Sequence, residues 1–116
     1  MTVETDMYTA LTDDSTISGI ISDRVYPAIS PDNRTYPLIV YNVVSTVPIG
    51  SSGCTRARIQ LDIYAGTYAV VKSIRDALQV LADATGNWTY VEGPDDYEDG
   101  EEVYRQVVDL IISNEV

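Results

Sequence analysis

Apolar residues recur along the chain at two different spacings, and the changes of spacing divide the sequence into helices and strands. Spacings of three and four residues gather side chains on one face of a helix. They predict a short N-terminal helix over 3–11, a weaker helical turn around 17–21 with its cap within 13–15, and a long helix capped by Thr67 and Gly86. The apolar stripe of the long helix is Val70, Val71, Ile74, Ala77, Leu78, Leu81 and Ala82.

Five further segments are alternately or continuously apolar, which predicts β-strands. The segment from Leu38 to Val44 is apolar on both faces and is expected to be a central strand, covered on two sides. The segment from Arg56 to Ala65 has one apolar and one polar face, so one face belongs to the core and the other meets water or a partner. The last segment keeps one apolar face except at Gln106. The predicted strands, the first of them at a sheet edge, cover 23–27, 38–44, 56–65, 88–91 and 103–113.

Two connections are rich in turn-forming or charged residues. The segment 48–53, with its glycines and serines, is a candidate for a loop that becomes ordered on assembly. The segment 92–102 is acidic and contains turn-forming residues, which predicts a loop between two paired strands. Together the elements predict a single α+β domain over 1–116. Its antiparallel or mixed β-sheet of about four to five strands is packed on one side by one long and one or two short helices.

Charge and composition exclude several classes of function. The 18 Asp and Glu residues outnumber the 7 Lys and Arg residues, and the net charge of -11 would repel nucleic acid. Cys54 is the only cysteine and histidine is absent, so an internal disulfide, a cysteine-based zinc cluster and histidine-dependent catalysis are excluded. We therefore expect no enzyme activity, no metal and no cofactor. No apolar run approaches the roughly 20 residues of a membrane span and no secretory signal is evident, so we expect a soluble protein that acts where it is made.

Three sequence motifs follow one another in a characteristic order and spacing. They are Asp-Arg-Val-Tyr-Pro at 23–27, Tyr-Pro-Leu-Ile-Val-Tyr at 36–41 and Arg-Ile-Gln-Leu-Asp-Ile-Tyr-Ala at 58–65, followed by the helix that begins near Thr67. In this order, over nearly the whole chain, the sequence resembles the bacteriophage tail-completion proteins, which are found in siphophages and prophages. The acidic segment 95–102 is more heavily charged than is usual in that family.

The resemblance implies a structural tail terminator, a subunit that joins a hexameric ring at the head-proximal end of the tail tube. The ring would stop polymerisation of the tube and join the tail to the head, with the tail tube protein and the head connector proteins as partners. DNA would pass through the ring without sequence-specific binding, and no membrane is involved. The protein would be made in the host cytoplasm and would end in the virion, at the head-tail junction.

A group of acidic residues is the first candidate for a functional surface. Asp95, Asp96, Glu98 and Asp99 would repel DNA if they faced a channel, and they would otherwise belong to an interface. The alternative is a solvated charged loop that keeps the protein soluble.

A second candidate surface lies on the strand that begins at Arg56. Arg56 and Arg58 are candidates for pairing with acidic residues across a subunit interface, because the guanidinium fork suits carboxylates. Tyr64 joins them because tyrosine combines apolar area with a hydroxyl group and is enriched in interfaces. Tyr68 and Tyr97 are further candidates for exposed tyrosines. Surface ion pairs within one subunit explain the two arginines equally well.

Two other functions stay open from the sequence. A head-closure or neck adaptor protein has a similar size and a similar place in the particle. An acidic mimic of nucleic acid that blocks a host DNA-binding protein also accounts for the net charge of -11. Co-purification with a host nuclease or repressor would favour the mimic, and a gene position beside the major tail protein gene would favour the terminator.

Overall fold

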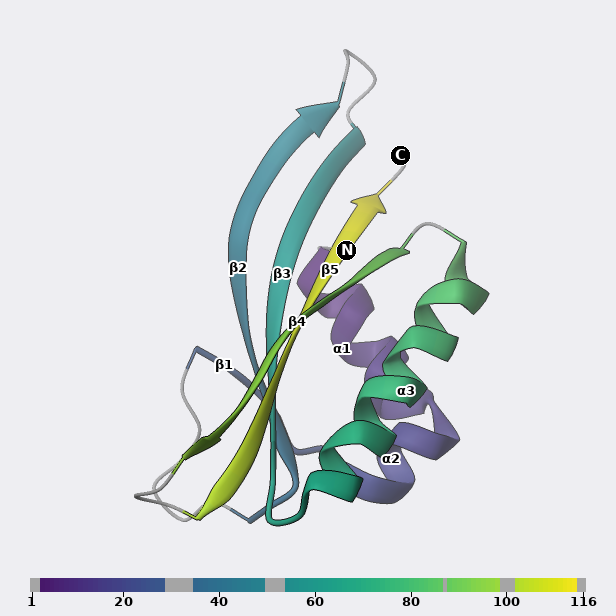
Figure 1. Cartoon of the computed structure of the whole chain (residues 1–116). Coiled ribbons are helices and arrows are strands. Elements are labelled where there is room, and N and C mark those ends of the chain that lie inside the picture. Colours follow the sequence, from purple (N-terminus) through teal and green to yellow (C-terminus); the bar gives the residue numbers. More distant parts are fainter. Residues whose placement is uncertain (1–2, 29–34, 50–53, 87, 99–101, 115–116) are drawn as a thin grey trace.

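The computed structural model of the chain describes residues 3–28, 35–49, 54–86, 88–98 and 102–114. The described residues form three helices and five strands (Figure 1). In chain order these are α1 (Val3–Asp13), α2 (Ser15–Ile21), β1 (Val25–Pro27), β2 (Leu38–Ile49), β3 (Cys54–Ala65), α3 (Tyr68–Thr85), β4 (Trp88–Glu98) and β5 (Val103–Asn114). The short second helix, which the sequence indicates only weakly, is therefore present.

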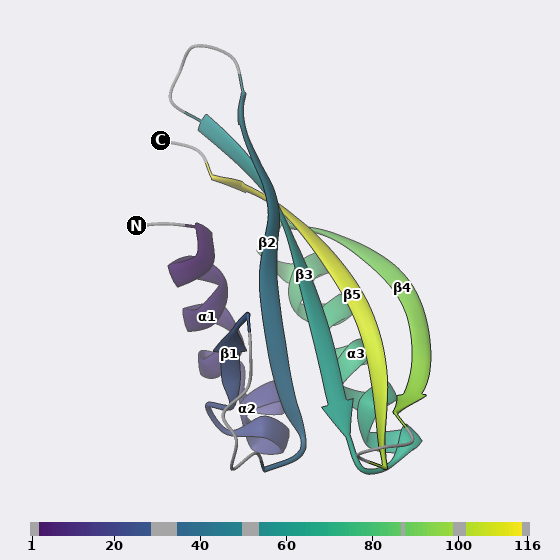
Figure 2. The same cartoon turned by 90° about the vertical axis from the view of Figure 1, so that its left-hand side faces the viewer.

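The described strands form one mixed sheet that carries the helices on a single face (Figure 2). The strand order across the sheet is β1-β2-β3-β5-β4. Strand β1 runs parallel to β2, and the other neighbouring pairs are antiparallel. The hairpin of β2 and β3 precedes α3 in the chain, and the pair of β4 and β5 follows it. This architecture confirms the predicted α+β fold class.

Side chains at the helix ends make the capping contacts that the sequence predicts. One carboxylate oxygen of Asp14 accepts hydrogen bonds from two backbone N–H groups in the first turn of α2, at 2.9 and 3.0 Å. The Thr67 hydroxyl accepts a hydrogen bond from the Val70 N–H at 3.3 Å, at the start of α3. Helix α3 ends at Gly86, whose φ of 80° lies in the left-handed region that glycine adopts without a side-chain clash. These contacts set the ends of the helices that cover the sheet.

The core lies between the helices and one face of the sheet. The predicted apolar face of β3 is confirmed, because Ile59, Leu61, Ile63 and Ala65 are all 0% exposed. Burial of such side chains is the main favourable term in folding. The helices contribute further fully buried residues, which are Met7, Leu11, Ile17, Ile21, Val71, Ile74 and Leu78. One face of the sheet is thus committed to the core, and the other face carries no helix among the described residues (Figure 2).

Strand β2 is longer and less covered than the sequence predicts. The strand predicted over 38–44 continues to Ile49. Its side chains are buried over 38–41, but Val43 and Val44 are 39% and 53% exposed. The prediction of a strand covered on two sides is therefore wrong for these two residues. The reason is that β1 pairs only with the first part of β2, and β2 then runs beyond the helices (Figure 1).

The acidic segment is mainly strand where the sequence predicts a loop. Strand β4 pairs with β5 along this segment, with a bulge between Glu92 and Asp95. The loop prediction is wrong for 92–98, because pairing with β5 places this polar segment in the sheet despite its low intrinsic strand propensity. At the bulge, a Cβ atom on Gly93 would lie 3.1 Å from the side chain and the carbonyl oxygen of Val107. Glycine therefore suits this close approach of the two strands.

Candidate subunit interface

The helix-free face of the sheet bears a polar network across β3 and β5. Arg58 Nη2 lies 2.6 Å from Asp109 Oδ2, and Arg105 Nη2 lies 3.1 Å from Asp62 Oδ1. Gln60 adds a hydrogen bond from its Nε2 to the same Asp62 oxygen at 3.2 Å. These five residues alternate with core residues along the two strands, so their side chains share one face. We call this surface the open face.

The open face is neither fully polar nor fully solvated. Asp62 is only 7% exposed, and Val107 and Ile111 are half-buried beside the charged side chains. One Asp109 oxygen, Oδ1, is buried without a hydrogen-bond partner among the described residues. Such an oxygen is unfavourable in a free subunit, and a mixture of apolar and polar groups is typical of protein interfaces. The open face is therefore suited to contact with another protein.

The hairpin of β2 and β3 extends beyond the helices as an arm (Figures 1 and 2). We define the arm as residues 42–49 of β2 with residues 54–58 of β3, in which 45–49 pair with 54–58. Along the arm, the outer edge of β2 has no neighbouring strand among the described residues. The predicted ordering loop 48–53 begins inside β2, and its residues 50–53 lie outside the described part of the chain.

Several side chains of the arm are exposed, although Ala57 is buried and Arg58 is paired with Asp109. Val44 and Val47 are each 53% exposed. Arg56 is exposed and forms no ion pair within the part of the chain that the structure describes. An unpaired strand edge with exposed apolar side chains is unusual on a soluble monomer and promotes pairing with other chains. The arm is thus the second surface that is suited to assembly.

The predicted interface residues share the open face but do not form one cluster. Arg56 and Arg58 lie in the arm, whereas Tyr64 lies near the other end of β3 and is half-buried. The distance from Arg56 to Tyr64 along the strand is roughly 26 Å, at about 3.3 Å per residue. Arg58 is paired with Asp109 inside the subunit, as the surface ion-pair alternative predicts, but Arg56 is not paired in this way. A role of these residues between subunits stays a prediction.

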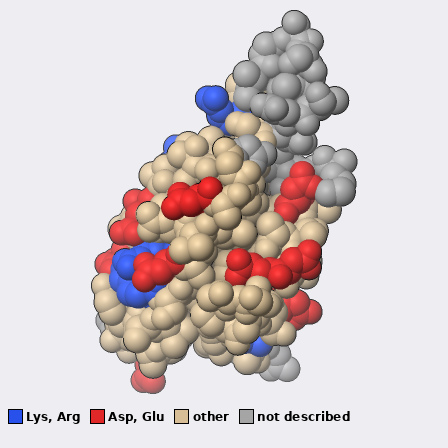
Figure 3. Space-filling model, turned by 90° about the vertical axis from the view of Figure 1, so that its right-hand side faces the viewer, with Lys and Arg blue, Asp and Glu red and all other residues tan. Residues whose placement is uncertain are grey.

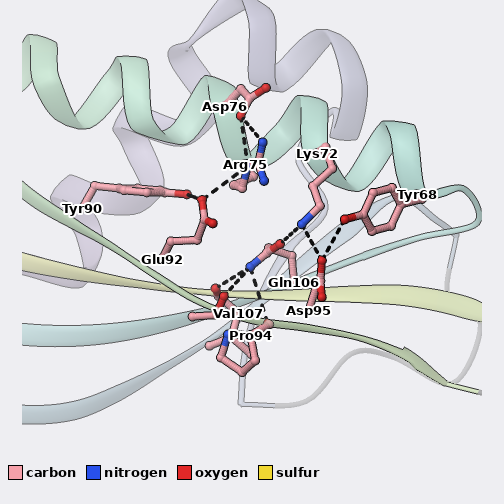
Figure 4. A network of polar contacts seen from close by, with 11 residues as sticks. Tyr68, Lys72, Arg75, Asp76, Tyr90, Glu92, Pro94, Asp95, Gln106 and Val107 are labelled. Atoms are coloured by element: carbon pink, nitrogen blue, oxygen red, sulfur yellow. Dashed lines mark hydrogen bonds and ion pairs between the residues drawn. The ribbon is translucent and has the colours of Figure 1, made fainter.

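A network of polar contacts ties the acidic strand β4 to α3 (Figure 4). Lys72 Nζ lies 2.7 Å from Asp95 Oδ2, and the Tyr68 hydroxyl donates to the same oxygen at 3.0 Å. These hydrogen bonds, with that of Lys72 the stronger influence, hold the pKa of Asp95 below its ordinary value of 3.8. Burial lowers the pKa of Lys72, but the hydrogen bonds and charges of Asp95 and Tyr68 together outweigh burial and raise this pKa. Asp95 is thus part of an ion pair within the subunit.

Gln106 is the polar exception on the apolar face of β5, and the network explains it. Its side chain is 1% exposed. Its Oε1 accepts a hydrogen bond from Lys72 Nζ, and its Nε2 donates to the carbonyl oxygens of Gly93 at 2.8 Å and Val107 at 3.1 Å (Figure 4). A buried amide needs such partners, because an unsatisfied one is costly. Gln106 therefore joins the bulge of β4 to α3.

Glu92, on the other side of the bulge, forms a second link between β4 and α3. Arg75 Nε lies 3.5 Å from Glu92 Oε1, and the Tyr90 hydroxyl donates to the same oxygen at 3.0 Å (Figure 4). Burial and then the hydrogen bond to Glu92 raise the pKa of Tyr90. The hydrogen bond to Asp76, at 2.7 Å, raises the pKa of Arg75. Two carboxylates of β4 are thus engaged by cations of α3.

Three tyrosines pack together beside this network. The ring centroids of Tyr68 and Tyr104 are 5.7 Å apart, and those of Tyr97 and Tyr104 are 4.8 Å apart. Tyr68 and Tyr97 are 49% and 42% exposed, which confirms the prediction of exposed tyrosines at these two positions. The half-buried Tyr64 fits that prediction less well. The cluster gives the β4 end of the sheet an amphipathic surface, apolar in its rings and polar in its hydroxyl groups.

The four acidic residues predicted for a channel or an interface do not share one surface. Asp95 lies on the helix side of β4, opposite Gln106. Asp96 points to the open face, because successive residues of a strand alternate, and it is exposed. The side chain of Glu98 and the whole of Asp99 lie outside the described residues. The strand therefore separates side chains that are adjacent in the sequence.

Two residues of this network, Lys72 and Gln106, are not predicted from the sequence as members of a site. The signal for Gln106 was present, since a single amide on an apolar strand face indicates a buried hydrogen-bonded group. The signal for Lys72 was weak, because a lysine outside the apolar stripe of a helix is normally solvated. The bulge in β4 turns Asp95 toward its ammonium group, and the alternation of β5 turns Gln106 toward it from the neighbouring strand.

The helix side of the molecule carries acidic groups in several separate places and few basic groups (Figure 3). Within the described residues, no group of three or more His, Cys, Asp or Glu side chains is placed to hold a metal ion. The helices in the same part of the chain include none that is long and apolar enough to cross a membrane.

Comparison with solved structures relates the fold to a virus-like particle. A chain of the structure titled "Virion of native gene transfer agent (GTA) particle" matches with a TM-score of 0.67 and 12% sequence identity. The match covers 94% of this chain and 91% of that chain. At this level of identity it shows a shared fold. A comparison with curated protein sequences finds no match.

The sequence itself supplies the family. The family model described as "Tail completion protein gp17" matches residues 5–113, which is nearly the whole chain. The class of protein so defined is a structural protein of the bacteriophage tail. More particularly, the chain belongs to the tail completion protein gp17 family. The resemblance drawn from the three motifs is therefore confirmed.

Proposed function

We propose that the protein is a tail terminator subunit. Six copies form a ring that caps the head-proximal end of the tail tube, stops its polymerisation and joins the tail to the head. The tail tube protein is the partner on one side of the ring, and the head connector proteins are the partners on the other. The subunit is made in the host cytoplasm and becomes part of the virion at the head-tail junction. It acts through binding, without catalysis, cofactor or sequence-specific contact to DNA.

The observation that carries this proposal is the family match over 5–113. The shared fold with a chain of a gene transfer agent virion supports a place in a particle. The open face and the arm add support, because both surfaces are suited to contact with another protein. Both surfaces combine exposed apolar groups with charge, as interfaces do.

Within the ring we place Arg56, Arg58 and Tyr64 in contacts between subunits. The acidic group of Asp95, Asp96, Glu98 and Asp99 belongs to the channel wall or to an interface. At a channel wall, like charge keeps DNA from binding, because carboxylates form no attractive contacts with phosphates. Asp96 is exposed on the open face and takes this role directly. Asp95 takes an indirect role, because its ion pair with Lys72 holds β4 in place.

Deletion of the gene from the phage that carries it tests the proposal. Electron microscopy of the lysate counts joined particles, free heads and free tails, and it measures the tail lengths. We expect overlong tails, or tails that are not joined to full heads, and a plasmid-borne copy of the gene restores joined particles. Intact infectious particles without the protein would overturn the proposal.

The same micrographs separate the two alternative functions. Tails of normal length beside heads that have lost their DNA would identify a head-closure or neck adaptor protein. An acidic mimic of nucleic acid would leave the particles intact and would co-purify with a host nuclease or repressor.

A further inference from the structure

A groove on the helix side of the molecule separates α2 from the exposed side of α3. Its lining residues are Asp14, Thr16, Ser73, Asp76, Ala77 and Val80. The four α3 residues are spaced three and four apart, so they lie along one side of the helix. Val80 is 69% exposed, more than any other large apolar side chain among the described residues. The groove thus has an apolar floor that the subunit does not cover.

Two carboxylates border this groove and keep unused acceptor capacity. The Oδ1 atom of Asp14 caps α2, and the Oδ1 atom of Asp76 pairs with Arg75. The second oxygen of each carboxylate makes no hydrogen bond or ion pair among the described residues. A guanidinium group that enters the groove therefore finds acceptors, next to an apolar contact surface.

The arm presents the complementary chemistry on a single surface. Val47 and Arg56 stand directly opposite each other in the β2–β3 ladder, so an exposed apolar side chain lies beside an exposed cation. Arg56 forms no ion pair within the described residues, whereas Arg58 is already paired with Asp109. The chain has a net charge of -11, so its acidic groups outnumber its basic ones. An arginine without an acidic partner, beside exposed valines, therefore stands out as a site for contact with an acidic surface.

The arm and the groove lie in separate parts of the molecule, so the arm of a subunit does not cover its own groove. The arm projects at one end of the sheet, and α2 lies at the other end (Figures 1 and 2). A contact between two different surfaces of identical chains is heterologous, and its repetition generates a ring where the rotation closes and an open filament where it does not. The arm of one subunit can therefore reach the groove of its neighbour, as a cyclic assembly requires.

We propose that the arm of one subunit docks into the α2–α3 groove of the next copy of this chain. Val47 packs against Val80, and Arg56 pairs with Asp76. This inference rests on the proposed ring and names the contact that closes it. The exposed valines and the unpaired arginine of the arm are then buried and neutralised on assembly.

Disulfide cross-linking in assembled particles tests this contact. A chain with Cys54→Ser, Val47→Cys and Val80→Cys complements the gene deletion, and the purified virions are oxidised and analysed by non-reducing electrophoresis. We expect a ladder of linked subunits that ends at the closed ring. A matched chain with Cys54→Ser, Val47→Cys and Val91→Cys gives no ladder, because Val91 is similarly exposed but lies on β4.

The cross-linking result separates this contact from the proposed ring. Virions that contain the variant subunit but give no ladder, or that link only through position 91, would overturn the docking and leave the terminator function intact. If virions of the wild-type phage do not contain this protein, the terminator function itself is overturned.

A charge exchange gives an independent measurement. Arg56→Glu and Asp76→Arg, each alone, lower the yield of joined particles by about tenfold, the effect of losing one interfacial ion pair. The two changes together restore the yield. Asp83→Arg, at an exposed α3 position outside the groove, changes the charge equally and leaves the yield unchanged. A double variant no better than the single ones, or an equal defect with Asp83→Arg, would overturn the pairing.

Discussion

Strand β4 and the arm lie toward opposite edges of the sheet, and they differ in whether their charged groups have partners within the subunit. At β4, Asp95 is held by Lys72 and Glu92 lies beside Arg75, so much of the acidic charge is engaged by α3. Along the arm, exposed valines stand beside the unpaired Arg56. The most charged segment of the chain is thus partly committed to the fold, and a weakly charged segment is free for a partner. Charge density alone does not mark the surface for assembly.

This difference predicts a division between stability and assembly. Residues outside the arm, including those that link β4 to α3, stabilise the free subunit. Residues of the arm contribute little until a neighbour covers them, because a side chain stabilises the fold in proportion to the surface that folding buries. Substitutions in the two regions should therefore differ in the property they change.

The largest difference is expected between a core residue of β3 and an arm residue of β2. Leu61→Ala lowers the free energy of unfolding by about 2–5 kcal/mol, because it removes a side chain that is 0% exposed and leaves a cavity. Val47→Ala changes it by less than about 0.5 kcal/mol, as is usual for an exposed position. Urea denaturation followed by circular dichroism measures both. Equal losses at the two positions would show that the arm is packed in the free subunit and would remove the contrast.

A smaller effect is expected at the amide that joins β4 to α3. Gln106→Ala lowers the free energy of unfolding by about 1–3 kcal/mol, because Lys72 and the Gly93 carbonyl group lose a buried partner. Gln79→Ala, at an exposed position of α3, serves as the control and changes it by less than about 0.5 kcal/mol. Amide hydrogen exchange should also be faster near the bulge in the Gln106 variant. If that variant is as stable as the wild type, strand pairing alone holds β4.

The parts of the fold that the sequence predicts are those that local patterns determine. The caps Asp14, Thr67 and Gly86 act within one helical turn, and the alternation along β3 records which face is buried. These signals need no knowledge of distant residues. The predicted helices, the buried face of β3 and the α+β class are accordingly confirmed.

The parts that the sequence does not predict depend on contacts between distant segments. The acidic composition of 92–98 indicates a loop, but pairing with β5 makes this segment a strand. The apolar run that ends at Val44 indicates full burial, but the cover from β1 and the helices stops earlier. The same limit applies to the candidate site, since Arg58 and its partner Asp109 are far apart in the chain. The alternation along β3 nevertheless placed Arg56, Arg58 and Tyr64 together on the face without helices.

The smallest effect concerns the ion pair of Asp95, and it depends on pH. The pKa of Asp95 in the folded protein lies below its ordinary value of 3.8, chiefly because of the hydrogen bonds from Lys72 and Tyr68. The carboxylate therefore stabilises the fold above that pH, and this contribution is lost as the pH falls through the lowered pKa. Asp95→Asn removes the contribution at neutral pH and makes the loss of stability on acidification less steep.

Urea denaturation at a series of pH values between about 2 and about 7 measures this slope. Asp96→Asn is the matched control, because Asp96 belongs to the same strand but points to the open face. The difference between the two variants should be small and should shrink with added salt, since the Asp95 carboxylate is partly exposed and ions screen it. Equal slopes for Asp95→Asn and the wild type would mean that Gln106 and the Glu92–Arg75 pair, and not the charge of Asp95, hold β4 to α3. The charge of Asp95 would then be as free for a partner as that of Asp96, and the contrast between β4 and the arm would rest on the Glu92–Arg75 pair and on hydrogen bonds.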